Sequence, residues 1–112
     1  MTIFEKMNGS KIEVKYETGT HYQITYLSES ELKWEALSEV AEGEAEVGID
    51  PYWTTNITDS IVNINWIEKD GLTASQVLDF NMNTAVVFLT WEDDSEYGNR
   101  GSILQRGTFE IK

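Results

Sequence analysis

Alternation of apolar and polar residues with a period of two is the feature that most limits how this chain can fold. It is plain in residues 11–16 (KIEVKY), 21–26 (HYQITY) and 31–36 (ELKWEA), where every second side chain is apolar. Successive side chains of an extended strand point to opposite faces, so the pattern predicts strands with one buried face. The glycine turn ETGT and the polar turn LSES separate the segments, which predicts an antiparallel meander.

The rest of the chain continues this pattern, with one ambiguous segment. Residues 36–50 (ALSEVAEGEAEVGID) contain helix-favouring Ala and Glu, but Gly43 and Gly48 interrupt them, so a strand with an acidic loop is favoured over a short helix. Further strands are expected in YWTTNIT, in a hairpin over residues 63–80, in TAVVFLTW and in SILQRGTFEIK. The sequence therefore predicts a single all-β domain, residues 1–112, with about eight antiparallel strands in a sandwich or barrel.

The hairpin in residues 63–80 (NINWIEKDGLTASQVLDF) has two possible registers, which differ in where Glu68 points. A two-residue turn at Asp70-Gly71 would mix polar and apolar residues on one face. A three-residue KDG loop with Gly71 in the left-handed conformation separates them, which favours this register. In it, Glu68 and Gln76 are the polar residues of the inward face. The apolar residues of that face are Val62, Ile64, Trp66, Leu72, Ala74, Leu78 and Phe80.

Composition excludes several classes of function. The 20 acidic and 8 basic residues give a net charge of −12, which repels phosphate backbones and anionic lipid, so neither nucleic acid nor a membrane is expected as a partner. The absence of cysteine, of a signal-peptide pattern and of any run of roughly 20 apolar residues fits a cytoplasmic protein. The acidic runs lack the ligand spacing of a calcium loop, and the single histidine, His21, faces outward by alternation. No metal and no cofactor are expected.

A carboxylate on the inward face at Glu68 has two explanations. Either it bends into solvent and supports the turn, or it is partly buried in a cavity, where desolvation raises its pKa and lets it bind or protonate a ligand. Inward tyrosines suit a packed core, but their hydroxyls also need partners, which a polar ligand or trapped water supplies. The candidate ligand-binding residues are Tyr16, Tyr22, Tyr26, Trp34, Ile64, Trp66, Glu68, Gln76 and Leu78.

Three stretches, YETGTHYQITYLSESELKWEAL, VNINWIEKDGLTASQVLDF and RGTFE, resemble the molybdenum cofactor biosynthesis protein F family in their order and spacing. The resemblance covers nearly the whole chain, from about Gly9 to Glu110. It implies a lipocalin-like (calycin) β-barrel with an interior ligand pocket, commonly dimeric. It does not imply that this protein takes part in cofactor synthesis.

The same strands are also similar to the bacterial phenolic acid decarboxylases, small barrels that remove CO2 from hydroxycinnamic acids without a cofactor. In that family two tyrosines and an arginine hold the substrate, and a glutamate handles the phenol. Tyr16 matches the second tyrosine, and Glu68, within WIEKDG, matches the glutamate. Val14 stands at the first tyrosine, and the arginine region reads VAEGEAEV with no basic residue, so two of the four positions match.

Three functions remain as alternatives. The favoured one is a barrel that binds a small, largely apolar organic ligand in its interior. The second is a cofactor-free lyase or decarboxylase acting on a phenolic or similar small acid, with Glu68 as the acid or base and Tyr16 as the hydrogen-bond donor. The third is an interaction module with a packed interior whose acidic surface meets a basic partner.

Residues 84–91 (TAVVFLTW) carry apolar side chains on both faces of the predicted strand. A strand of this kind lies either between two layers or under a partner. Together with the family resemblance, this pattern predicts a homodimer.

Overall fold

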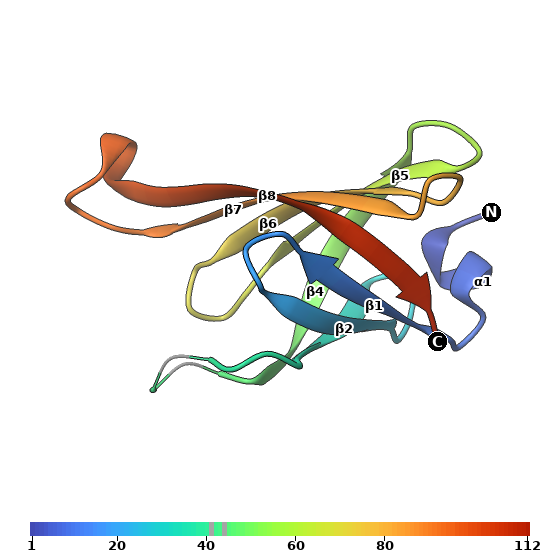
Figure 1. Cartoon of the computed structure of the whole chain (residues 1–112), viewed down its shortest axis with the longest axis horizontal. Helices are drawn as coiled ribbons and strands as arrows, with labels where there is room; N and C mark the ends of the chain where they lie inside the picture. The colour runs from blue at the N-terminus through green and yellow to red at the C-terminus, as the bar shows by residue number, and fades with distance from the viewer. Residues whose placement is uncertain (41, 44) are drawn as a thin grey trace.

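The computed structural model describes residues 1–40, 42–43 and 45–112 and shows an all-β protein (Figure 1). Its antiparallel strands form a closed barrel in the order β1-β2-β3-β4-β5-β6-β7-β8, and β8 pairs with β1. This architecture confirms the fold class expected from the alternation. The elements are α1 (Ile3–Met7), β1 (Lys11–Tyr16), β2 (His21–Tyr26), β3 (Glu31–Ala36), β4 (Val47–Asn56), β5 (Ile61–Ile67), β6 (Thr73–Asp79), β7 (Thr84–Glu92), the 3-10 turn η1 (Tyr97–Asn99) and β8 (Arg100–Ile111).

The ambiguous segment between β3 and β4 is a loop followed by a strand. Residues 37–40, 42–43 and 45–46 form turns and irregular backbone, and β4 begins at Val47. The favoured expectation, a strand with an acidic loop, is therefore confirmed where the structure describes the segment. Ala41 and Glu44 lie outside the described residues.

The β5–β6 hairpin has the register that the hydrophobic pattern favours. Trp66 pairs with Ala74 and Ile64 with Gln76. The Glu68 amide donates to the Leu72 carbonyl at 2.8 Å, and the Gly71 amide donates to the Glu68 carbonyl at 2.9 Å. Gly71 has φ +93°, the left-handed conformation that this three-residue loop requires. Glu68 and Gln76 consequently share the inward face with Trp66.

One end of the barrel is covered by α1, which the sequence analysis did not expect (Figure 1). Thr2 Oγ1 accepts from the Glu5 amide at 3.1 Å, and the Thr2 amide donates to Glu5 Oε1 at 3.0 Å, a capping box that stabilises the first turn. Ile3 and Met7 turn inward and are buried. None of the helices in the described residues is long and apolar enough to cross a membrane.

Barrel closure depends on a close approach between β8 and β1 at Gly107. Gly107 pairs with Tyr16, and a Cβ added to Gly107 would overlap the Lys15 carbonyl oxygen, which is backbone and cannot rotate away. We expect Gly107→Ala to lower the free energy of unfolding by about 1–3 kcal/mol, as overpacking does elsewhere. Urea denaturation measures this change. Ser102→Ala, exposed on the same strand, is the control, and equal midpoints for both variants would contradict the proposed steric limit.

Candidate ligand-binding site

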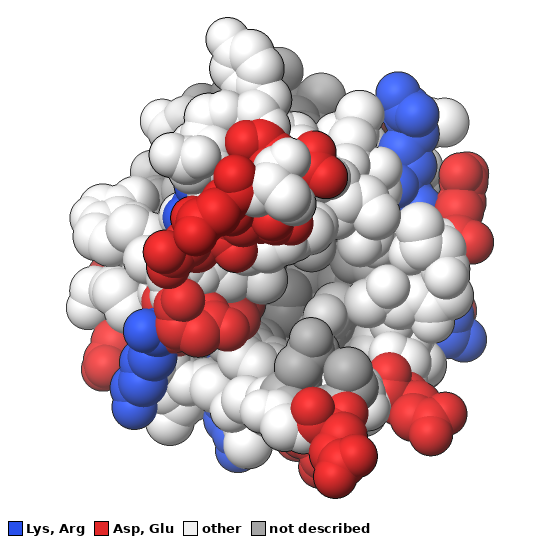
Figure 2. Space-filling model, turned by 90° about the vertical axis from the view of Figure 1, so that its left-hand side faces the viewer, with Lys and Arg blue, Asp and Glu red and all other residues white. Residues whose placement is uncertain are grey.

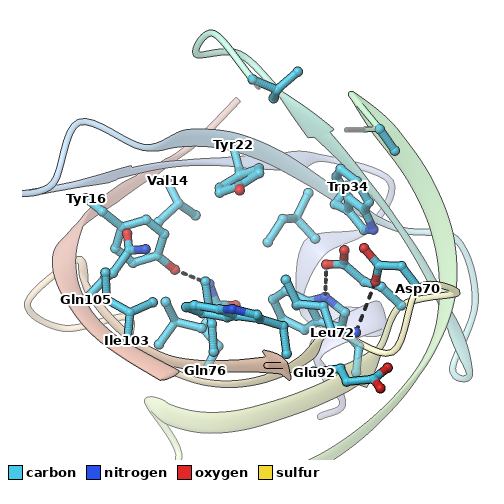
Figure 3. A pocket seen from close by; sticks show the side chains of 18 residues that line it. Val14, Tyr16, Tyr22, Trp34, Asp70, Leu72, Gln76, Glu92, Ile103 and Gln105 are labelled. Atoms are coloured by element: carbon cyan, nitrogen blue, oxygen red, sulfur yellow. Dashed lines mark hydrogen bonds between the residues drawn. The ribbon is translucent and has the colours of Figure 1, made fainter. Parts of the chain in front are cut away.

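The barrel is packed solid in the half that α1 covers and hollow in the other half. Core residues such as Leu32, Ile64 and Leu78 are 0 % exposed in the packed half. The hollow half holds a cavity of about 630 Å³ (Figure 3). Its apolar walls are Val14, Ile24, Trp34, Val40, Ala45, Trp66, Leu72, Val87, Leu89, Trp91 and Ile103, and its polar residues are Tyr16, Tyr22, Glu68, Asp70, Gln76, Glu92 and Gln105.

Most of the residues chosen from the sequence as ligand contacts line this cavity. They are Tyr16, Tyr22, Trp34, Trp66, Glu68 and Gln76. The other three, Tyr26, Ile64 and Leu78, also point inward but lie in the packed half, away from the cavity wall. Tyr26, for example, packs edge-on against Tyr52 with ring centroids 5.4 Å apart. The difference arises because alternation sets the direction of a side chain and not its depth along the barrel.

A buried hydrogen bond between Gln76 and Tyr16 forms the inner polar end of the cavity. Gln76 Nε2 donates to Tyr16 Oη at 2.8 Å, whereas Gln76 Oε1 has no partner among the described residues. Burial raises the pKa of Tyr16 well above its ordinary value, so the phenol stays neutral and keeps its hydroxyl hydrogen. Thr18 Oγ1 donates to the neighbouring Gln105 Oε1 at 2.8 Å. This end therefore offers a ligand one hydroxyl donor and one carbonyl acceptor.

Glu68 forms a second polar position beside the hairpin loop. Trp66 Nε1 donates to Glu68 Oε2 at 3.1 Å, and the side chain is half-buried at the cavity wall. Burial raises the pKa of Glu68 to about 7, against the lowering effect of the Trp66 bond, and the charges of Asp70 and Asp50 raise it further. Both the inward direction and the raised pKa agree with the second explanation given for this residue.

Trp34 is fixed by a buried carboxylate that the sequence analysis did not single out. Trp34 Nε1 donates to Asp50 Oδ2 at 2.8 Å, and Asp50 is 3 % exposed. Gly48 pairs with Trp34 across β3 and β4, and a Cβ there would lie 2.7 Å from the indole. The missing side chain thus lets the indole lie flat over β4. The approach of Trp34 to Asp50 and Gly48 depends on the register between β3 and β4, which alternation alone does not predict.

Residues 8–104 match the MoaF-like family. The chain belongs to this family. The MoaF-like barrel is also similar in structure to the crystal structure of a "putative beta-lactamase" from Burkholderia vietnamiensis, with a TM-score of 0.74 and 19 % identity over 93 % of each chain. At this identity the likeness shows the fold alone. No curated protein matches the chain.

The MoaF-like barrel carries acidic groups at the mouth of its cavity. Figure 2, which faces the barrel end that carries the β7–β8 hairpin, shows Asp and Glu side chains around a central hollow. Glu68, Asp70 and Glu92 reach the cavity lining, which contains no Lys, Arg or His among the described residues. The nearby Arg100 donates from Nη2 to the Gly71 carbonyl at 3.1 Å and to Thr90 Oγ1 at 2.9 Å. No three metal-ligating side chains gather in the described part of the chain.

Further lining residues come from β8 and from β7, the strand that the sequence analysis treated as a possible dimer surface. Val87 and Leu89 on β7, and Ile103 and Gln105 on β8, face the cavity. Alternation along the two strands was the signal for their inward direction. The polar Gln105 in particular follows the same pattern as Gln76, since both interrupt an otherwise apolar inward face.

Proposed function

We propose that this protein binds a small, largely apolar organic molecule inside the hollow half of its barrel. The observation that supports this function best is the cavity of about 630 Å³, bounded by aromatic and aliphatic side chains. Ligand pockets of roughly 300–1,000 Å³ with apolar walls and a few placed polar groups are typical of small-molecule sites. Eight-stranded barrels commonly hold one such ligand.

Catalytic turnover in the same cavity has one observation in its favour. A pKa of about 7 suits Glu68 to general acid or base chemistry near neutral pH. A phenolic acid, however, brings a carboxylate to a cavity lined by Glu68, Asp70 and Glu92, and the described lining has no cation to hold it. Like charges repel strongly where water is partly excluded. We therefore propose binding rather than decarboxylation of an acid.

Fluorescence titration with an uncharged dye, N-phenyl-1-naphthylamine, tests the proposed function. An apolar cavity should brighten the dye and saturate at one dye molecule per chain, with a dissociation constant of about 1–10 μM, as expected for a ligand of this size. Intrinsic tryptophan fluorescence should change in parallel because Trp34, Trp66 and Trp91 line the cavity. Non-saturating binding, or no brightening, would contradict the proposal.

We also propose that the outward face of β7 and β8 joins two copies of the chain. Phe88 and Leu104 are paired across these strands and are 46 % and 53 % exposed. On β6, the neighbouring Ser75 and Val77 are uncharged. Arg106, paired with Val86, is the charged residue beside them, and in a protein with a net charge of −12 a patch without carboxylates is where a second copy approaches with little repulsion.

Sedimentation velocity at tens of micromolar measures this association. The wild-type protein is expected to sediment as a dimer. Phe88→Glu should shift it to the monomer, because the change places two carboxylates close to a twofold axis. Asp94→Asn, on the exposed β7–β8 hairpin, serves as a control and should leave the dimer intact. A monomeric wild-type protein would refute the interface.

A further inference from the structure

The charged side chains in the described lining of the cavity are all acidic. Three carboxylates reach its lining, Glu68, Asp70 and Glu92, and no Lys, Arg or His does among the described residues. Arg100, which pairs with Glu92 between β7 and β8, donates from Nη2 to the Gly71 carbonyl and to Thr90 Oγ1. A bound anion would therefore be repelled by these lining carboxylates, whereas a bound cation would be attracted.

Besides the Tyr16 hydroxyl, two hydrogen-bond acceptors of the cavity have capacity left for a ligand. Gln76 is 1 % exposed and lines the cavity, yet its Oε1 has no partner in the described part of the chain. A buried acceptor without a partner is costly, so a ligand that supplies an N–H or O–H group gains at this position once the Gln76 amide turns Oε1 toward the cavity. Within the described residues Glu68 accepts a side-chain bond from Trp66 through Oε2 only, which leaves Oε1 for a donor on the ligand. Both positions favour a ligand that donates.

Aromatic faces surround these acceptors. Trp34, Trp66 and Tyr22 line the cavity, and Tyr22 packs edge-on against Trp34 with ring centroids 6.3 Å apart. Figure 3 shows Tyr22 and Trp34 along one wall and Gln76 along the facing wall, with Tyr16 at one side of the cavity and Asp70 and Glu92 at the other. Indole and phenol rings attract organic cations through their negative faces.

The two acceptor positions are well separated along the barrel. Glu68 faces Leu72 across the hairpin, and Gln76 lies four residues farther along the β6 region, about 13 Å at the usual rise of a strand. An elongated molecule with donors at both ends would satisfy both groups. Its middle would lie against Leu72, Trp66 and Val87.

We propose that the cavity takes organic amines: a primary or secondary ammonium pairs with Glu68, and an aromatic or aliphatic body with a second donor extends toward Gln76. This assignment rests on the proposed function, since it names the class of ligand for the same cavity. An ammonium satisfies the free carboxylate oxygen, and its charge is favoured by Asp70 and Glu92 at the mouth. Carboxylic acids of the same shape are rejected by the same groups.

Three indole compounds that differ only in their head group provide the test: tryptamine, tryptophol and indole-3-acetate. Each competes with the uncharged dye at pH 8, where Glu68 is ionised and an alkylamine remains protonated. Tryptamine is expected to displace the dye at a concentration about tenfold lower than tryptophol, because an ion pair in a partly buried site contributes on that scale. Indole-3-acetate should require at least about tenfold more than tryptophol for the same reason.

Two variants separate the role of Glu68 from the general effect of net charge. Glu68→Gln should reduce the advantage of tryptamine over tryptophol to about twofold or less, with both competitors compared on the same variant, while circular dichroism stays unchanged. Asp94→Asn removes the same charge from the exposed hairpin and should keep the full advantage.

The outcomes distinguish this inference from the proposed function. If the dye binds but tryptamine displaces it no better than tryptophol, including when neither displaces it, the amine assignment is overturned and the apolar cavity stands. If the amine preference survives Glu68→Gln unchanged, Glu68 is not the partner and the assignment also fails. If the dye itself does not bind, the proposed function fails first.

Discussion

Filling the cavity with two tryptophans, Val87→Trp together with Ile103→Trp, is expected to weaken dye binding by at least about 30-fold, or about 2 kcal/mol. Both side chains face the cavity from adjacent strands, β7 and β8. Two indoles would occupy the space that the dye needs. Overpacking ordinarily costs about 1–3 kcal/mol of stability, but here the rings enter open volume, so the melting temperature should change little.

The matched control is Val86→Trp on the same strand. Val86 is the neighbour of Val87 and points outward, as its pairing with Val77 and Arg106 shows. Dye titration of this variant should give the wild-type affinity. Two results would show that the dye binds outside the cavity. One is an equal loss of affinity in the inward and outward variants, and the other is wild-type affinity in the variant whose cavity is filled.

Glu68→Gln is expected to stabilise the protein at pH 8 and to leave its stability unchanged at pH 4. The folded pKa of Glu68 is about 7, raised from the model-compound value of 4.5 mainly by burial. Below pH 4.5 the residue is protonated in both states, so its full contribution is present. Between pH 4.5 and about 7 the unfolded chain loses the proton more readily, and stability falls as pH rises.

The expected gain for Glu68→Gln at pH 8 is about 1–2 kcal/mol. Complete linkage would give about 3 kcal/mol, and solvent screening of a half-buried group reduces it. Urea denaturation at pH 4, 6 and 8 measures the difference. The exposed control Asp94→Asn should stay within about 0.5 kcal/mol of wild type at each pH. A pH-independent difference between Glu68→Gln and wild type would contradict the raised pKa.

Side-chain direction was the property most accessible from the sequence. Alternation predicted the first three strands with their observed bounds, and the hydrophobic consistency of one register placed Gly71 in the left-handed loop position. That register also turned Glu68 inward and brought it beside Trp66. A two-residue period and a glycine at a defined loop position are local signals, and local signals survive without knowledge of distant contacts.

Depth along the barrel was not accessible in the same way. Tyr22 and Tyr26 alternate identically on β2, yet Tyr22 lines the cavity and Tyr26 lies in the packed half. The division between the halves depends on α1, whose Ile3 and Met7 are buried under one end. The capping-box pattern at Thr2 and Glu5 was a signal for this helix, but its packing on the barrel is a long-range contact.

The partner of Trp34 illustrates the same limit. Asp50 is far from Trp34 in sequence, and the two meet because Gly48 lies opposite the indole in the β3–β4 register. The many acidic residues between Glu29 and Asp50 are typical of a solvent-exposed segment. Composition alone does not show that Asp50, at the end of this segment, is buried. Pairing between strands, rather than residue type, decides which acid is structural.

The most direct measurement of the central claim is an NMR experiment on methyl-labelled protein saturated with the uncharged dye. Intermolecular NOEs are expected between the dye rings and the methyl groups of Val14, Val87 and Leu89, which face the cavity. The exposed methyl groups of Leu104, on the outer face of β8, should show none. NOEs to Leu104 in the absence of NOEs to Val14, Val87 and Leu89 would place the ligand on the outer surface and contradict an interior binding site.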